Sequence, residues 1–374
     1  MKLVKRFAAM SLAVIMALVA AGCHKKDEIA VKIGDWEFTS AYYMCTMIYA
    51  DTEARQTIDK QLAEKNKDDS SSSTSSEDID YLSQKIDDMS FTDWVKKETL
   101  KNLHRVAAYK TKCKEAGLEL DDTAVSGVEQ SAEYYWSQYG YQSMLEPNGV
   151  SKETFTEYLK NSYYSSLYFD HLYGEGGERE ISADDVQAKI VENYVVANVI
   201  NASYESNATD EQKSELKAKL DGYANAISAG KMTFNDAYKD YYGQEDSEDA
   251  STSDTDAEDG SQPQDSKAQI LGSSETSQAS DYFETVKAMA NGAAQTVISS
   301  DGGGLVLLVK KDIAADPYYF KNLDSAARQL ISGKDLESEM ETFGESLEFK
   351  EYKSNTNQFK VKKIVYPETS TSAS

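Results

Sequence analysis

Cys23 is the residue whose position most clearly predicts a chemical reaction, the acylation of its thiol. It follows small residues at 20–22, an uncharged run at 7–21 and a basic start at 2–6. A basic start, an apolar run too short to span a bilayer and small residues before the cut are typical of a secretory signal. A cysteine directly after the cut is typical of bacterial lipoprotein signals. We therefore predict a signal peptide over 1–22 and a lipid on Cys23; the alternative is a cytoplasmic chain whose apolar start arose by chance.

The other residues of reactive type are few and scattered. Cys45 and Cys113 either form one disulfide or, as we favour, are two separately buried thiols. His24, His104 and His171 stand far apart in the sequence, and no CxxC pair occurs. Structural zinc sites need four such ligands at short, regular spacing. We therefore predict no metal site and no cofactor.

The charge of the chain excludes one class of partner. It has 39 Lys and Arg against 64 Asp and Glu, a net charge of −25, and loss of the three basic residues of the signal makes this −28. Such a charge repels nucleic-acid phosphates and anionic lipids, so nucleic acid is not expected as a partner. Membrane contact should come from acyl chains on Cys23, which would hold the protein on the extracytoplasmic face of a bacterial cell membrane.

The first half of the chain is predicted to be mainly helical. Residues 29–38 have the pattern of a strand or hairpin, and a helical pattern follows at 40–65. The polar segment 66–77 has nothing to bury and is predicted to be a mobile loop. Ser90–Asp93 fits a capping box at the start of a helix that ends near Gly117. Two further helices are predicted at 122–138 and 151–172.

The second half alternates between helical and strand patterns, which predicts an α+β unit. An acidic segment at 244–265 is predicted to be a disordered insertion, because it consists largely of Asp, Glu, Ser and Thr. Near the C-terminus, 359–365 alternates like an edge strand and is expected to pair with 31–38. The other predicted elements are helices at 183–194, 210–229, 233–241, 281–290 and 317–343, and strands at 195–200, 295–298 and 305–309.

Aromatic residues are concentrated in two predicted helices of the first half. They exceed what one helical stripe can bury, so some should be exposed. Exposed aromatic side chains that line a cleft can hold extended chains through contact area, with little demand on sequence. Core packing accounts for most of them, and a chain-binding surface is the alternative for the rest. The set comprises Tyr134, Tyr135, Trp136, Tyr139, Tyr141, Phe155, Tyr158, Tyr163, Tyr164 and Tyr168.

Several of these segments resemble one family of foldases. The segment Val31–Phe38 and the helix from Phe91 to Gly117 are similar to the opening elements of the PrsA and SurA foldases. The second half resembles a parvulin-type peptidyl-prolyl isomerase domain in its order of elements, with the best match at Ser228–Gly230, Phe234 and Tyr241. The resemblance covers most of the chain after the signal. It implies an α+β fold in which a parvulin-like domain is inserted into a helical chaperone domain built from both chain ends.

The sequence departs from the parvulin pattern at the residues that matter for catalysis. Parvulins carry a histidine on the first strand of the domain, where this chain has Asn198, and another on the last strand, where the alignment gives Leu305. Leu305 can neither donate nor accept a hydrogen bond. Tyr282 or Phe283, together with Met289, occupies the positions of the proline-contacting side chains, and the alternative is that these are ordinary core residues. The resemblance thus implies a domain whose catalytic residues are not identified.

The resemblance and the signal together imply a lipid-anchored extracytoplasmic foldase or chaperone that binds unfolded or newly exported polypeptides. The alternatives are an active prolyl isomerase and a solute-binding lipoprotein of a transporter, which would have two similar lobes. The implied division is a signal peptide at 1–22, an N-terminal helical chaperone domain at 23–175, a parvulin-like domain at 181–313, a C-terminal helix and strand at 314–366 that return to the chaperone domain, and a disordered tail at 367–374.

Overall fold

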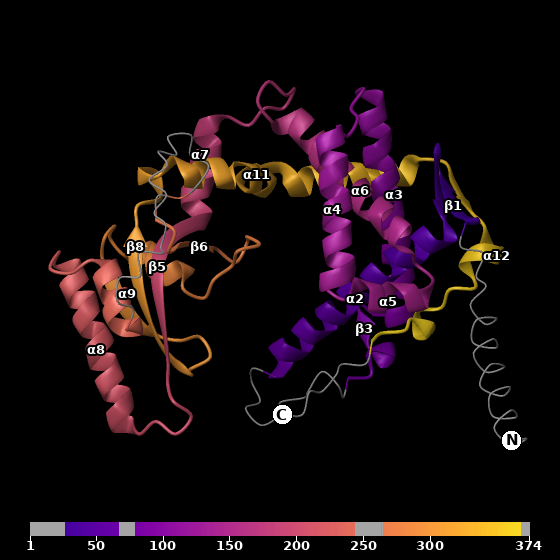
Figure 1. The fold of residues 1–374 in the computed structure, drawn as a ribbon. Helices are drawn as coiled ribbons and strands as arrows, with labels where there is room; N and C mark the ends of the chain where they lie inside the picture. Colours follow the sequence, from indigo (N-terminus) through magenta and orange to yellow (C-terminus); the bar gives the residue numbers. More distant parts are fainter. Residues whose placement is uncertain (1–26, 67–78, 244–262, 264, 368–374) are drawn as a thin grey trace, which may run out of the picture. The chain divides into compact units, whose positions relative to one another are not determined.

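The structure is a computed structural model of mixed helices and strands (Figure 1). This mixture confirms the predicted α+β class. None of the described helices is both long and apolar enough to cross a membrane. The described residues are 27–66, 79–243, 263 and 265–367.

Several predicted segments fall on the remaining residues. The signal peptide and Cys23 lie wholly outside the described residues. The predicted loop at 66–77, the acidic insertion at 244–265 and the tail at 367–374 lie outside them except at their ends.

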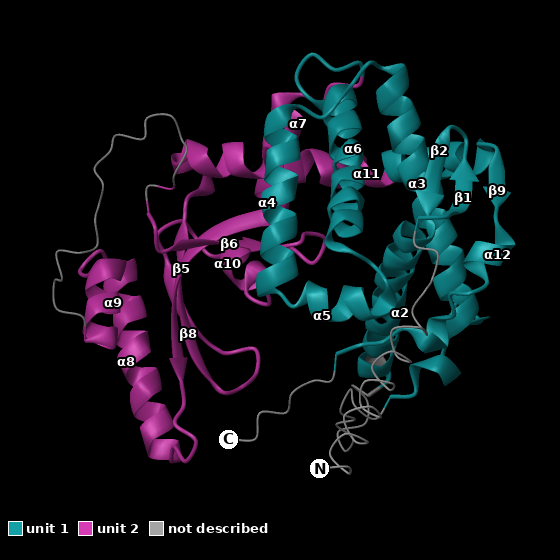
Figure 2. Cartoon of the chain, turned by 45° about the vertical axis from the view of Figure 1, so that its right-hand side comes forward, with its two compact units in different colours: residues 1–178, 335–374 teal, residues 179–334 magenta. Residues whose placement is uncertain are grey.

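The chain divides into two compact units (Figure 2). Unit 1 contains the residues up to 178 and those from 335 onward, and unit 2 contains 179–334. Unit 2 is therefore inserted in the sequence of unit 1. The second boundary lies within helix α11 (Pro317–Ser346) rather than before it, and Arg328 of this helix donates a hydrogen bond to the Ile181 carbonyl inside unit 2 (2.7 Å). The described parts of the two units are not similar lobes of the kind that a solute-binding protein would have.

Unit 1 combines a small antiparallel sheet with packed helices. Strand β1 pairs on one side with β2 and on the other with β9, with Val31 opposite Phe38 and Lys32 opposite Lys350. The apolar faces of the helices and the sheet share one core. The elements are β1 (Ile29–Ile33), β2 (Trp36–Thr39), α2 (Ser40–Asn66), η2 (Tyr81–Ser83), β3 (Lys85–Ile86), β4 (Met89–Ser90), α3 (Phe91–Glu115), α4 (Asp122–Gln138), α5 (Tyr141–Leu145), η3 (Glu146–Asn148), α6 (Lys152–Tyr173), β9 (Phe349–Glu351), α12 (Lys353–Thr356) and η5 (Val361–Lys363).

Helix α3 begins and ends where its sequence predicts. The Ser90 side chain accepts a hydrogen bond from the Asp93 amide (3.2 Å) and donates one to the Asp93 carboxylate (2.7 Å). These bonds satisfy an amide that a helix start would otherwise leave unpaired. Gly117 follows the last turn with φ of +69°, a conformation that glycine adopts at little cost.

The predicted strand at 359–365 is wrong. The segment that pairs with β1 is β9 (Phe349–Glu351), and 359–365 instead contains the 3₁₀ turn η5. A strand has two edges, and those of β1 are already paired with β2 and β9. Phe359 and Val361 are nevertheless buried in the core of unit 1, so the alternating pattern reports burial without sheet pairing.

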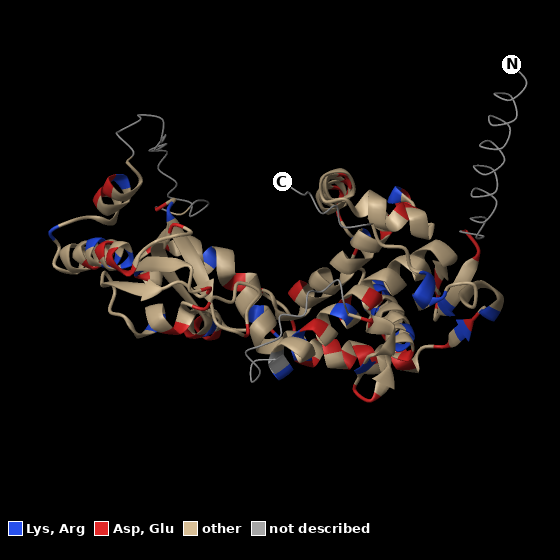
Figure 3. Ribbon diagram, turned by 90° about the horizontal axis from the view of Figure 1, so that it is seen from below, with Lys and Arg blue, Asp and Glu red and all other residues tan. Residues whose placement is uncertain are grey.

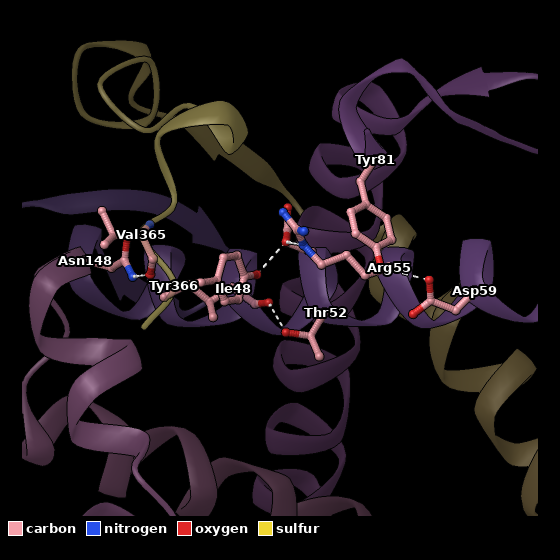
Figure 4. A network of polar contacts seen from close by, with 9 residues as sticks. Ile48, Thr52, Arg55, Asp59, Tyr81, Asn148, Val365 and Tyr366 are labelled. Carbon is pink, nitrogen blue, oxygen red and sulfur yellow. Dashed lines mark hydrogen bonds and ion pairs between the residues drawn. The ribbon is translucent and has the colours of Figure 1, made fainter. Parts of the chain in front are cut away.

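Polar contacts fix the end of the described chain to unit 1 (Figure 4). The Asn148 side chain donates to the Val365 carbonyl (2.7 Å) and accepts from the Val365 amide (2.9 Å). The buried Asp51 carboxylate accepts hydrogen bonds from Arg55 Nε (2.6 Å) and from the Tyr366 hydroxyl. The Arg55 guanidinium also lies over the Tyr366 ring, 4.6 Å from its centroid.

Unit 2 is built on a four-stranded antiparallel sheet of order β6-β5-β8-β7. The central pair is β5 and β8, and its register runs without a shift from Val196 opposite Lys311 to Ser203 opposite Gly304. The elements are α7 (Ala183–Asn193), β5 (Tyr194–Ser203), α8 (Asp210–Ser228), α9 (Phe234–Tyr242), β6 (Ala268–Gly272), α10 (Phe283–Ala288), β7 (Ala294–Ile298), β8 (Gly304–Lys311), η4 (Ile313–Ala315) and the first part of α11.

The sheet of unit 2 has an apolar core on each face. On one face, Ile200 and Leu307 pack with residues of α8 and α9 such as Leu220. On the other face, residues of β5 and β8 pack with α10, which contributes Phe283 and Val286. Because both faces are covered, the central strands are apolar almost throughout, which explains the continuous run in the sequence.

Candidate functional site

Three exposed tyrosines lie together at the C-terminal end of α4 in unit 1. The exposed fractions of Tyr134 and Tyr139 are 54% and 62%, and Tyr135 is exposed as well. The ring centroids of Tyr134 and Tyr139 are 5.3 Å apart, and those of Tyr135 and Tyr139 are 5.6 Å apart. We call Tyr134, Tyr135 and Tyr139 the tyrosine cluster. Aromatic rings that contact each other while facing solvent form a surface that is both apolar and polarisable.

The position of the buried face on α4 explains why these rings are exposed. Val128, Ala132 and Trp136, four residues apart, form the stripe that is buried. Tyr134 and Tyr135 lie off this stripe. The helix ends just before Tyr139, and Gly140 with φ of +72° turns the chain into α5.

A series of ring–ring contacts connects the tyrosine cluster with the core. Tyr135 lies 5.8 Å from Tyr141, and Tyr141 stacks 5.3 Å from Phe155, measured between centroids. Phe155 is fully buried and also contacts Trp136. An open depression of about 600 Å³ lies where α4 is followed by α5, lined by residues that include Trp136, Gly140 and Glu146 but none of the three tyrosines.

The other aromatic residues of the predicted set are also buried in some cases and exposed in others. Tyr158 stacks on Tyr49 with centroids 4.6 Å apart, and burial is the main cause that raises its pKa above the usual range. Tyr168 is buried, and Tyr163 is exposed at another place on α6. Core packing therefore accounts for one subset of these aromatic residues, and another subset is exposed, as the sequence predicts.

In unit 2, the predicted proline-pocket residues are mostly part of the core. The exposed fraction of Phe283 is only 3%, and it packs with Leu271, Val286 and Leu308. Met289 packs against the same core. The alternative that these are ordinary core residues therefore applies to Phe283.

Tyr282 has a different position. Its hydroxyl accepts a hydrogen bond from the Ser300 amide in the loop between β7 and β8 (3.1 Å). It also lines a cavity of about 260 Å³ together with residues that include Asn201, Asp301 and Val306. Tyr282 is therefore a candidate pocket residue that borders a cavity in unit 2.

Asn198 and Leu305 do not lie beside these pocket candidates. Successive residues of a strand face opposite sides of the sheet. Ile200 and Leu305 belong to the core under α8 and α9, whereas Ala197 belongs to the core with Phe283. Asn198 is two residues from Ile200 on an unshifted strand, so it shares the face of Leu305. The structure thus places the two aligned histidine positions on the face opposite to Phe283.

If the alignment with the parvulin histidines is shifted by one residue, the aligned positions still contain no side chain that can replace a histidine. Such a shift moves a side chain to the other face of the sheet. Val199 and Val306 then replace Asn198 and Leu305, and both pack on the core that contains Phe283. The sequence 179–334 contains neither His nor Cys. A histidine network of the parvulin type therefore cannot form from residues of unit 2.

Asn198 instead belongs to a polar group that the sequence did not predict. Its side-chain amide donates to Asp265 Oδ2 (2.9 Å), and Lys311 Nζ donates to the same oxygen (3.0 Å). Asn198 is 2% exposed, and its own Oδ1 has no hydrogen-bond partner among the described residues. Burial alone would raise the pKa of Asp265, but the hydrogen bonds from Asn198 and Lys311 outweigh it and the pKa is lowered.

Asp265 was predicted to end the acidic insertion, and this assignment is wrong. The Asp265 carboxylate also accepts a hydrogen bond from the Lys267 amide (3.1 Å), and its carbonyl accepts one from the Ala268 amide at the start of β6. It is therefore part of the folded sheet unit. In the sequence, the feature that could have indicated this is that Asp265 lies only three residues before the first residue of strand β6, Ala268.

Cys45, Cys113 and His104 of unit 1 are held in the packed structure. Cys45 and Cys113 are both buried and free, as the interpretation of two separate thiols predicts. Burial raises the pKa of Cys113 to about 11, which disfavours the reactive thiolate. His104 Nδ1 lies 2.8 Å from the Gly344 carbonyl. Among the described residues, no group of three or more His, Cys, Asp and Glu side chains could hold a metal ion.

Comparisons with known proteins found similarity among solved structures. No protein-family model and no curated protein sequence matches the chain. Among solved structures, it is similar to the foldase protein PrsA from Streptococcus pneumoniae, with 15% identity, a TM-score of 0.38 and coverage of 70% of this chain and 90% of that one. It is also similar to the foldase protein PrsA from Lactococcus lactis, with 14% identity, a TM-score of 0.35 and coverage of 89% and 99%.

Proposed function

We propose that this protein is a lipid-anchored chaperone of the foldase type, which binds unfolded or newly exported polypeptides through the tyrosine cluster of unit 1. The carrying observation is the exposure of Tyr134, Tyr135 and Tyr139 as rings that contact one another. Large rigid rings provide contact area at a small cost in side-chain entropy and place few demands on the sequence they contact. This is the property that binding of many different unfolded chains requires.

The proposal includes attachment to a membrane through Cys23. Its support is the order of basic, apolar and small residues that precedes this cysteine. Two or more acyl chains would hold the protein stably, since each buried CH₂ contributes about 0.8 kcal/mol. The extracytoplasmic face of the cell membrane would bring the tyrosine cluster close to chains as they emerge from export.

The proposal assigns to unit 2 a parvulin-like fold without histidine-based catalysis. The supports are the resemblance of its element order to that family and the sheet order β6-β5-β8-β7. Rotation about a prolyl bond faces a barrier of about 20 kcal/mol, so a catalyst must stabilise the twisted amide. With valines at the positions that face Phe283 and no histidine in 179–334, the parvulin hydrogen-bond network has no donors there.

Suppression of aggregation tests the chaperone function. The chain from residue 24 onward keeps every described residue, and in stoichiometric amounts it should prevent a chemically unfolded protein from aggregating on dilution. The double variant Tyr134→Ser, Tyr139→Ser should need about thirtyfold more protein for the same effect, since each ring contributes about 1 kcal/mol. Tyr163→Ser, which changes an exposed tyrosine elsewhere, serves as control. Aggregation that proceeds unchanged even in excess of the wild-type chain would contradict the proposal.

Attachment is tested separately by Cys23→Ser. In a bacterial host that processes lipoproteins, the wild-type chain should incorporate labelled fatty acid and sediment with membranes. The variant should do neither. Labelling that persists in the variant would exclude Cys23 as the modified residue.

An active prolyl isomerase is the second candidate, and the cavity beside Tyr282 is the observation that favours it. A protease-coupled assay with peptides that differ in the residue before proline measures this directly. We expect no acceleration above background while circular dichroism shows a folded protein. Acceleration that is lost in Tyr282→Ala would overturn the assignment of a degenerate domain and identify the cavity as the active site.

A further inference from the structure

The charges around the tyrosine cluster distinguish it from a general apolar surface. The segment 119–148, which contains α4 and α5, has six acidic residues and no Lys or Arg. Figure 3 shows where basic and acidic residues lie along the described ribbon. The nearest basic residue after it, Lys152, forms an ion pair with Glu133 of α4. Glu129 and Glu146 are exposed on either side of the tyrosines in the sequence. The acidic residues of this segment are Glu119, Asp121, Asp122, Glu129, Glu133 and Glu146.

The rings of the cluster also lack the cations that other aromatic rings of this chain have. Lys110 lies 4.4 Å from the centroid of Trp36, and Arg55 lies 4.6 Å from that of Tyr81. Among the described residues, no Lys or Arg lies over Tyr134, Tyr135 or Tyr139. Their faces carry the negative potential of the π system and are open to a cation from outside.

We propose that the tyrosine cluster selects extended segments rich in Lys and Arg, which place their cations over the rings and between the neighbouring carboxylates. This inference rests on the proposed chaperone function and adds its substrate class. Two features favour a cationic occupant over a neutral apolar chain. The ring faces attract cations, and among the described residues Glu133 is the one carboxylate of 119–148 that forms an ion pair with a basic residue. Both features disfavour an acidic chain or an anionic lipid surface, because these would bring like charges together.

Matched peptides test this substrate class. Three extended peptides share the same apolar residues and differ at four positions, which are all Lys, all Gln or all Glu. Binding to the chain from residue 24 onward is measured by fluorescence anisotropy at low salt. The Lys peptide should bind at least tenfold more tightly than the Glu peptide, with the Gln peptide between them. The difference should shrink as salt increases, because exposed charges are screened over about 10 Å at 0.1 M.

Two variants separate the contribution of the rings from that of the carboxylates. Tyr134→Leu, Tyr139→Leu keeps apolar area but removes the ring faces, and it should weaken the Lys peptide about tenfold while it changes the Gln peptide little. Glu129→Gln, Glu146→Gln leaves the Glu133–Lys152 ion pair intact and should weaken only the Lys peptide, about threefold. Tyr163→Leu is the control and should change neither affinity.

The outcomes also separate this inference from the function on which it rests. Equal affinity for all three peptides, with loss of all binding in the tyrosine variant, would overturn the charge preference and leave chain binding in place. Tighter binding of the Glu peptide would overturn the inference outright. Failure of all three peptides to bind, together with unchanged aggregation in the chaperone assay, would overturn the proposed function itself.

Discussion

Unit 1 and unit 2 place their candidate binding residues in opposite environments. In unit 1, Tyr134 and Tyr139 stay exposed although the helix that carries them is well packed, with Trp136 buried between them in sequence. In unit 2, Phe283 is buried between α10 and the sheet and supports the fold. The same class of side chain is thus exposed in the tyrosine cluster of unit 1 and packed in the core of unit 2. The exposed fraction of the side chain distinguishes the two sets of residues better than their residue type or their place in the family alignment does.

Truncation of Phe283 should give the largest effect. Phe283→Ala is expected to destabilise unit 2 by about 3–5 kcal/mol, because it removes a fully packed ring. Trp36, Trp94 and Trp136 all belong to unit 1, so tryptophan fluorescence reports that unit alone. In urea titrations, the transition seen by circular dichroism should move while the fluorescence transition stays in place. Wild-type stability in this variant would contradict the core role of Phe283.

The two glycines of α11 test packing at the middle and near the C-terminal end of the helix. A Cβ at Gly344 would lie 2.6 Å from the His104 backbone oxygen of α3, whereas a Cβ at Gly333 would meet only the end of the flexible Gln329 side chain. Gly344→Ala should therefore destabilise unit 1 by about 1–3 kcal/mol. Gly333→Ala should be neutral or stabilising by up to about 1 kcal/mol, because alanine favours the helix. Thermal unfolding of both variants measures the contrast, and equal shifts would contradict it.

The polar group around Asp265 should make the stability of unit 2 depend on pH. The pKa of Asp265 is lowered in the folded state, so its contribution is present above the unfolded pKa of about 3.9 and is lost as the pH falls below that value. Asp265→Asn should cost about 1–2 kcal/mol at pH 7 and flatten the loss of stability in acid. Asp281→Asn, at an exposed aspartate of the same unit, is the control. An unchanged acid profile in Asp265→Asn would exclude this carboxylate as the cause.

The smallest stability effect is expected at the tyrosine cluster. Tyr134→Ser, Tyr139→Ser should change the free energy of unfolding of unit 1 by less than about 0.5 kcal/mol, as is usual for exposed positions. Tryptophan fluorescence in a urea titration measures this. A loss comparable to that of Phe283→Ala would mean that the rings are part of the core, and it would remove the contrast between the units.

The sequence predicted best those features that depend on neighbouring residues. The capping bonds of Ser90 and Asp93 involve residues three apart, so the start of α3 could be located from the sequence. The apolar runs of β5 and β8 reflect burial on both sheet faces and were assigned as strands. The surplus of aromatic residues correctly predicted that some of them would be exposed.

Features that depend on long-range pairing were predicted less well. The segment 359–365 alternates because alternate residues are buried, and only the pairing of β1 with both β2 and β9 shows that β1 has no edge left for it. The face of Asn198 and Leu305 depends on strand register, where an error of one residue reverses the side. Asp265 resembles its acidic neighbours in composition, and its bonds to Asn198 and Lys311 join residues distant in sequence.

The insertion of unit 2 between the two parts of unit 1 has a consequence for the order of folding. Strand β1 begins at Ile29, but its partner β9 begins at Phe349, so this pairing closes a loop of more than 300 residues. A chain that emerges from a channel with its N-terminus first can complete the sheet of unit 2 while β1 still has one open edge. Contacts of such high sequence separation form slowly. Unit 1 should therefore mature last, and a nascent chain that stalls before residue 349 would expose an unpaired strand that invites pairing with other chains.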